Sequence, residues 1–186
     1  MELHIKNMVC DRCIMAVNNA AIQVGLQPQS VTLGMLVLPD PVPAAALDEL
    51  QEALTRLKFE LIDDRRTQIA TRVKTVIIDL IHGRTEPTAL KLSEYIATTL
   101  QMDYQYLSKL FATEEGTTIE QYVIRQKIER VKELLSYGQM SLNQIADDMG
   151  YSSVQHLSAQ FRQVTGLTAS AYKAAGHNDR RGLDAL

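Results

Sequence analysis

The sequence contains no tryptophan and only two cysteines among its 186 residues. Both cysteines lie in the segment Cys10-Asp11-Arg12-Cys13, which excludes a framework of several disulfides and points to metal binding or redox chemistry instead. Long apolar runs are also absent: none approaches the ~20 residues of a membrane helix, and the N-terminus lacks a basic stretch followed by an apolar one. We therefore expect a soluble protein of the cytoplasm.

A basic excess is missing as well, since the net charge is −3 and nucleic-acid binders are usually basic. The acidity is confined to residues 1–66, which carry 6 Lys+Arg against 9 Asp+Glu. The totals of 19 and 22 leave 13 of each for residues 67–186. A neutral second part can bind DNA if its basic groups share one face, with a modest and salt-sensitive affinity for phosphates.

The first third of the chain has the pattern of a small α+β domain. Residues 2–8 alternate apolar and polar positions as a half-buried strand does, and residues 14–24 have helical spacing. Ser30–Val37 is again β-like, residues 44–57 form an amphipathic helix, and residues 59–62 form a closing strand. The predicted order is β, α, β, α, β, with room for one extra short strand near Gly34.

Met8-Val9-Cys10-Asp11-Arg12-Cys13 joins the first strand to the first helix. Two thiolates separated by two residues can converge on one soft ion, and a helix N-terminus lowers the pKa of a thiol. Two sulfurs suit Cu(I). A closed Zn(II) site needs four ligands and only His4 or Asp11 could join the pair within this domain, so Zn(II) is the second choice unless two chains share the ion.

This segment resembles the metal loop of heavy-metal-associated domains, the ferredoxin-like βαββαβ modules of copper chaperones and metal-transporting ATPases. The resemblance implies that Cys10 and Cys13 bind the metal. The 13 residues from Ser30 to Val42 leave little room for two strands, so the hairpin must be stunted or one strand lost. Cysteines kept only for packing, and a thioredoxin-like redox use of the pair, are the alternatives.

Residues 63–66 are a charged break, at which we place the domain boundary. Ile69, Val73, Val76 and Leu80 then step by four, three and four, the spacing of a coiled-coil seam. The 67–82 helix could therefore form a homodimer, or it could pack within a monomer as short amphipathic helices more often do.

Residues 141–172 predict a helix-turn-helix. Leu142, Ile145 and Met149 give one helix an apolar face, Gly150 ends it, and a second helix presents the residues Leu157, Phe161 and Val164. Ser141 with Gln144, and Ser152 with Gln155, each fit a capping box at a helix start.

A second copy of this pattern precedes it. Ile96-Ala97 recurs as Ile145-Ala146 at an offset of 49, and the positions that recur at an offset of 50 are Leu107, Phe111, Gly116 and Thr118. One extra residue in the second turn explains the change of offset. Between the copies, Thr117 and Glu120 fit a capping box that opens a helix reaching Ser136. Its 20 residues span roughly 30 Å, close to the ~34 Å between successive major grooves.

Residues 67–175 resemble the seven-helix DNA-binding domain of AraC-type transcription regulators. The matching segments are Tyr106-Leu-Ser-Lys-Leu-Phe111, Gly116-Thr-Thr-Ile-Glu-Gln-Tyr122, Lys127-Ile-Glu-Arg-Val-Lys-Glu-Leu-Leu135, Ser141-Leu-Asn-Gln-Ile-Ala146, Gly150-Tyr-Ser-Ser153 and Gly166-Leu-Thr-Ala-Ser-Ala-Tyr172. The resemblance implies double-stranded DNA as the partner and two recognition helices in one chain.

The exposed faces of those helices supply the candidate DNA contacts. They are Tyr104, Gln105, Ser108 and Lys109 in the first unit and Ser153, Gln155, His156 and Arg162 in the second. Gln suits the adenine edge and Lys the guanine edge, so we expect base reading mainly in the first unit and more phosphate contacts in the second.

The sequence therefore predicts an α+β chain in three parts: a ferredoxin-like α/β sandwich at 1–66, an all-α domain at 67–175 with two helix-turn-helix units joined by a long helix, and a flexible tail at 176–186. The predicted function is a transcription regulator of the cytoplasm, at the nucleoid, that responds to a thiophilic metal. A metal chaperone or buffer whose helical domain docks on a protein partner is the alternative. An enzyme is not expected, since no phosphate loop and no paired acid and base are present.

Overall fold

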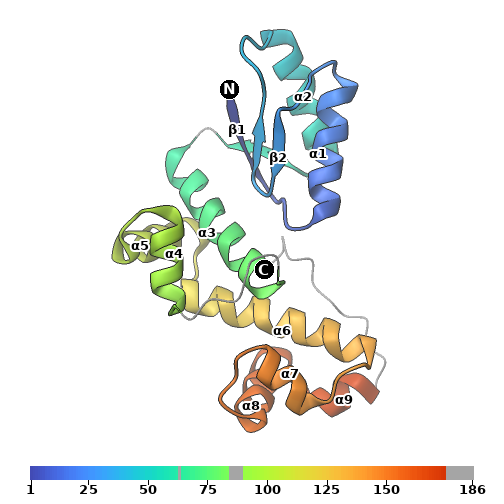
Figure 1. The fold of residues 1–186 in the computed structure, drawn as a ribbon, viewed down its shortest axis with the longest axis vertical. Coiled ribbons are helices and arrows are strands. Elements are labelled where there is room, and N and C mark those ends of the chain that lie inside the picture. The colour runs from blue at the N-terminus through green and yellow to red at the C-terminus, as the bar shows by residue number, and fades with distance from the viewer. Residues whose placement is uncertain (63, 84–89, 175–186) are drawn as a thin grey trace. The chain divides into compact units, whose positions relative to one another are not determined.

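The computed structural model describes residues 1–62, 64–83 and 90–174 (Figure 1). Its first elements are β1 (Glu2–Lys6), α1 (Asp11–Gln23), β2 (Ser30–Thr32), β3 (Met35–Val37), α2 (Ala44–Arg56) and β4 (Glu60–Ile62). The helices that follow are α3 (Arg65–Ile81), α4 (Leu92–Leu100), α5 (Tyr104–Glu115), α6 (Ile119–Tyr137), α7 (Leu142–Asp148), α8 (Val154–Thr165) and α9 (Ala169–Ala174). The described residues fall into two compact units. One holds Met1–Val76 with α4 and α5, and the other holds the end of α3 with α6 to α9.

The four strands form one antiparallel sheet in the order β2-β3-β1-β4. Leu36 pairs with Leu3, and Ile5 lies two residues further along β1, so Ile5 and Leu36 point to the same face of the sheet; both are fully buried there. Helix α1 contributes Val17 to this core, and α2 contributes Leu50 and Leu54, all with no exposed surface. Figure 1 shows α1 and α2 together on one side of the sheet. The strands and helices that the sequence predicted in residues 2–62 are confirmed.

The hairpin between the two helices is as short as the 13-residue limit required, since β2 and β3 have three residues each. Gly34 turns the chain with a φ of +79°, a conformation that side chains resist. A Cβ atom here would lie 3.4 Å from Thr75 Oγ1 and 3.5 Å from Thr71 Cγ2, so the turn lies against α3. The extra strand predicted near Gly34 is β3.

Helix α3 begins within the predicted charged break. Asp64 accepts a 2.9 Å hydrogen bond from the backbone N–H of Thr67, so it caps the helix, and this bond lowers the pKa of its carboxyl. Of the predicted dimer seam, Ile69 and Val73 are buried inside the chain. The helix therefore packs on its own chain along part of the seam, and the oligomeric state stays a prediction.

Helix α6 has 19 residues and a length of about 28 Å, close to the expected value. One face of the helix is apolar and buried, with Ile128, Val131 and Leu135. Thr118 rather than Thr117 caps the helix, accepting from the backbone N–H of Gln121, so the predicted capping box is wrong by one position.

Within the described part of the chain, no helix is long and apolar enough to cross a membrane. The predicted boundary at residue 66 falls at the start of α3, and it stays a prediction. The predicted tail, 176–186, lies outside the described residues.

Candidate nucleic-acid interface and cysteine pair

The first helix-turn-helix consists of α4 and α5. Leu100 ends α4, and Gln101 takes a left-handed conformation with a φ of 53° that turns the chain. Asp103 then caps α5 by accepting a 2.9 Å hydrogen bond from the backbone N–H of Tyr106. Leu107 and Phe111 have no exposed surface, which fixes the rotation of α5 and leaves its opposite face to solvent.

The second helix-turn-helix consists of α7 and α8. The capping box of Ser141 and Gln144 is confirmed in both directions, with the Gln144 side chain accepting from the Ser141 backbone at 2.8 Å. The box predicted at Ser152 is wrong, because Ser153 caps α8 by accepting from the backbone N–H of His156 at 3.1 Å.

The apolar face of the second unit is only partly as expected. Ile145, Leu157 and Phe161 are fully buried, whereas Val164 is 41% exposed near the end of α8. Val164 is therefore a surface residue, and the prediction that it belongs to the buried apolar face is wrong.

The two units repeat each other in their backbone as well as their sequence. The N–H of Met102 donates to the oxygen of Ala97, and the N–H of Tyr151 donates to that of Ala146, at an offset of 49. The caps recur at an offset of 50: Asp103 with Ser153, Gly116 with Gly166, and Thr118 with Thr168. The extra residue therefore lies between Tyr151 and Ser153, which places it at Ser152.

A lysine of α6 holds the turn of the second unit. Lys127 Nζ donates a 2.7 Å hydrogen bond to the oxygen of Met149 and lies 5.3 Å from the ring centroid of Tyr151. Burial lowers the pKa of Lys127 and raises that of Tyr151 to about 12. The Tyr151 hydroxyl donates to Gln160 Oε1 at 2.7 Å, so the turn is fixed to both α6 and α8.

The predicted contacts of α5 lie on its outer surface. Gln105 and Lys109 are exposed and one helical turn apart, so both can reach the same ligand. Tyr104 and Ser108 are half-buried. Lys109 is also brought next to Arg66 of α3, a residue that the sequence did not single out, and the two line one pocket with Tyr106.

The predicted contacts of α8 are more constrained. Gln155 and Arg162 are exposed, but the Ser153 hydroxyl is engaged as the helix cap. His156 Nδ1 lies 3.2 Å from the hydroxyl of Ser152, and its ring meets Tyr151 edge-on at 5.3 Å. Local contacts therefore orient His156, and Gln155 is the better placed residue for a base edge.

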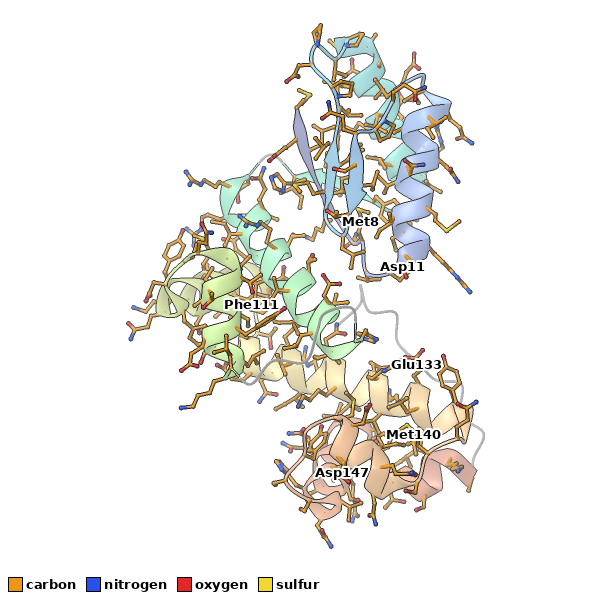
Figure 2. All side chains as sticks on the ribbon, viewed as in Figure 1. Met8, Asp11, Phe111, Glu133, Met140 and Asp147 are labelled. Atoms are coloured by element: carbon orange, nitrogen blue, oxygen red, sulfur yellow. The ribbon has the colours of Figure 1, made fainter. Side chains whose placement is uncertain are left out.

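The cysteine pair lies at the first turn of α1, as the sequence predicted, with Met8 before it and Asp11 within it (Figure 2). Cys10 is the N-cap residue, and the two half-buried thiols have their Sγ atoms 3.4 Å apart. Both sulfurs can reach about 2.3 Å from one ion at this separation, with an angle of roughly 95° at the ion. Among the described residues, no group of three or more His, Cys, Asp or Glu side chains is arranged to hold a metal.

The Cys13 thiol is not activated in the way the sequence suggested. Its pKa is raised, chiefly by burial and also by the hydrogen bond and the charge of the Cys10 side chain, although backbone hydrogen bonds at Val9 and Cys10 act to lower it. The expectation of a lowered thiol pKa is therefore wrong for Cys13.

Comparison with known proteins matches residues 96–175 to a family described as a helix-turn-helix domain. The chain is 24% identical over 134 residues to the probable transcriptional regulator LumQ of Photobacterium leiognathi, covering 72% of this chain and 52% of LumQ. It is 30% identical over 132 residues to the transcriptional activator NphR of a Rhodococcus species, covering 70% of this chain and 38% of NphR. The chain thus spans about half or less of the length of these relatives.

Among solved structures, the C-terminal domain of AraT, a response regulator from Geobacillus stearothermophilus, is similar in fold. It has a TM-score of 0.50 and 22% identity, over 60% of this chain and 88% of that domain. The matched relatives are transcription regulators rather than enzymes. Residues 96–175 of this chain therefore match a helix-turn-helix domain, and its helical part is similar in fold to the C-terminal domain of AraT.

Proposed function

We propose that this chain is a sequence-specific DNA-binding transcription regulator of the cytoplasm whose activity responds to a thiophilic metal bound by Cys10 and Cys13. The observation that carries the DNA-binding part is the pair of equivalent helices, α5 and α8, each of which has a side-chain cap at its start and a buried apolar face. Buried Leu107 and Leu157 turn the polar faces of these helices outward. An exposed face with Gln and Lys is what a helix needs to read base edges in the major groove.

The candidate base contacts favour α5 over α8. Gln105 and Lys109 both have exposed side chains, whereas Ser153 and His156 are held by hydrogen bonds within the second unit. We infer that α5 supplies most of the sequence discrimination and that α8 contributes Gln155 and phosphate contacts from Arg162.

DNA binding is tested by selecting 20-bp duplexes from a randomised pool with the full chain and measuring Kd by fluorescence anisotropy. Gln105→Ala should weaken the selected duplex about tenfold and relax the preference at one base pair, because a bidentate contact to adenine is lost. Gln121→Ala, an exposed position on α6, is the matched control. No DNA affinity even at low salt would contradict the proposal and favour a metal chaperone that docks on a protein.

The order β1-α1-β2-β3-α2-β4, with the sheet order β2-β3-β1-β4, supports a heavy-metal-associated, ferredoxin-like N-terminal domain. The donor set supports Cu(I), because two soft thiolates suit that ion, while Zn(II) prefers four ligands. Metal binding would require both thiols to lose their protons, so we expect proton release on titration.

The metal response is tested by titrating the protein with Cu(I) and Zn(II) under anaerobic conditions and measuring DNA binding of each form. The double variant Cys10→Ser/Cys13→Ser should lose Cu(I) binding and any effect of the metal on Kd. Unchanged metal affinity in that variant would rule out metal sensing through Cys10 and Cys13. It would not contradict the proposed DNA binding.

Contacts within the compact unit that holds the sheet, α4 and α5 could transmit a structural change from the sheet to α5. The Gly34 turn lies against Thr71 and Thr75 of α3. From α3, Arg66 reaches Glu114 at 3.1 Å and Lys74 reaches Glu115 at 2.6 Å, both at the end of α5. A metal-dependent shift of the sheet on α3 would therefore act on the helix that we assign to base reading.

A further inference from the structure

A pocket of about 230 Å³ lies beside α5, in the compact unit that also holds the sheet. Arg66 comes from the start of α3, and the other lining residues come from α5: Tyr106, Lys109, Leu110 and Thr113. These four follow the helical spacing i, i+3, i+4 and i+7, so they share one face of α5. Leu110 is buried and forms the floor, while Tyr106 and Lys109 are exposed at its edge.

The lining of this pocket is positively charged. It contains two cations, Arg66 and Lys109, and no acidic residue. Glu114 lies outside the lining and accepts from Arg66 Nε at 3.1 Å. The Arg66 side chain is still 56% exposed, and its two terminal nitrogens carry four further N–H donors. The ion pair thus orients the guanidinium at the pocket without covering it.

We propose that this pocket holds one phosphate of the DNA backbone, through the guanidinium of Arg66, the ammonium of Lys109 and the hydroxyl of Tyr106. A phosphate offers several oxygens, which suits the planar guanidinium and the point charge of the lysine together. Tyrosine hydroxyls are common phosphate donors as well. This inference rests on the proposed DNA binding and deepens it.

Two consequences follow for the proposed interface. Lys109 contacts the backbone and not a guanine, which replaces the base contact considered for it above and leaves Gln105 as the main base-reading residue of α5. Arg66 lies four residues after Ile62, the last residue of β4, so the start of α3 joins the sheet directly to the DNA backbone. A phosphate contact fixes the register of a recognition helix without reading sequence itself.

The test measures the salt dependence of Kd for the full chain on its selected duplex. Arg66→Gln should weaken binding about five- to tenfold and lower the slope of log K against log salt by up to about 0.9, because one cationic contact with the phosphate is lost. The loss should be equal on selected and scrambled duplexes. Arg65→Gln is the matched control, since Arg65 is the exposed neighbour in sequence and does not line the pocket.

Glu114→Gln separates a phosphate contact from a structural ion pair. If Arg66 served only to hold α3 on α5, Glu114→Gln would weaken DNA binding as Arg66→Gln does, and the inference would be overturned. If Arg66 binds phosphate, removing the competing carboxylate should leave Kd unchanged or lower it. A salt slope unaltered by Arg66→Gln in a protein that binds DNA would overturn this inference alone, whereas a parent protein without DNA affinity would overturn the proposed function too.

A free phosphate ion has the same chemistry as a backbone phosphate, and competition distinguishes the two. Sodium phosphate should displace the duplex no better than sodium chloride of equal ionic strength. Stronger displacement by phosphate, with an unaltered slope in Arg66→Gln, would assign the pocket to a free anion.

Discussion

Lys127 of α6 donates a 2.7 Å hydrogen bond to the backbone oxygen of Met149, at the C-terminal end of α7. The last carbonyls of a helix have no partner within it, so a lysine here satisfies one of them and also favours the negative end of the helix dipole. The bond joins the long helix to the turn of the second helix-turn-helix unit.

Replacing this lysine should destabilise the second unit. Lys127→Met keeps most of the apolar stem but removes the charge-assisted hydrogen bond and the contact with the Tyr151 ring, so we expect a loss of about 1–2 kcal/mol in the free energy of unfolding. Urea denaturation followed by circular dichroism measures it. Arg125→Met, at an exposed position of the same helix, should change stability by less than about 0.5 kcal/mol. Equal stability of the two variants would show that the Met149 contact contributes nothing.

His4 of β1 should make stability depend on pH. Burial is the largest cause of its lowered pKa, the positive charge of Arg72 on α3 adds to the effect, and Glu2 opposes it. Because the pKa is below its ordinary value of 6.5 in the folded protein, the unfolded chain binds the proton more tightly. The free energy of unfolding should therefore fall as pH drops below 6.5 and recover as pH rises back through that value.

Urea midpoints between pH 5 and pH 7.5 check this dependence. His4→Gln should flatten the part of the profile near pH 6, and Arg72→Gln should flatten it less, since burial and not charge is the larger cause. A profile that is the same in the parent and in His4→Gln would assign the pH dependence to other groups.

The sequence predicted the elements of this chain well because their periodicity is set by burial. Ile96, Leu107 and Phe111 are buried as their repeat partners in the second unit are, and helical spacing alone identifies such positions. The capping residues were harder to predict. Thr117 and Thr118 are adjacent and chemically equivalent, and only the backbone conformation decides which one caps α6.

The candidate site was predictable in part for the same reason. Exposed positions of α5, such as Gln105, follow from the helix period once the core face is known. The role of Arg66 could not be predicted, because its place in the same pocket as Lys109 depends on how α3 packs against α5, and the 42 residues between Arg66 and Lys109 carry no signal of that contact. The raised pKa of Cys13 was equally hidden, since it arises from burial and not from the position of the thiol in a helix.

Removing the glycine from the second helix-turn-helix turn and introducing one into the first should have opposite effects on stability. Gly150 has a φ of 67° and Gln101 a φ of 53°, and side chains are strained in this region. Gly150→Ala should cost about 1–2 kcal/mol, whereas Gln101→Gly should be neutral or stabilise by up to about 1 kcal/mol. Thermal unfolding measures both. Gln101→Ala is the control and should resemble the parent, because both residues carry a Cβ. Destabilisation by Gln101→Gly would mean that the glutamine side chain itself stabilises the first turn.

Glu129 and Lys132 of α6 form an ion pair with its two polar atoms 2.6 Å apart, in side chains only 4% and 9% exposed. The Lys132 ammonium also lies 5.9 Å from the ring centroid of Tyr172 in α9, so the pair joins α6 to the last described helix. Removing one partner of a buried pair takes this interaction away from the other charge, which stays in a buried environment.

Lys132→Ala should therefore destabilise the second unit strongly, by about 3–5 kcal/mol, as should Glu129→Ala. The double change Glu129→Leu/Lys132→Met replaces both charges with apolar groups of similar size and should cost far less than the sum of the single changes, or stabilise the protein. Urea denaturation of the parent, the two single variants and the double variant gives the coupling between the residues. The additive result, in which the double variant loses the sum of the two single losses, would mean that the two charges are compensated independently of each other.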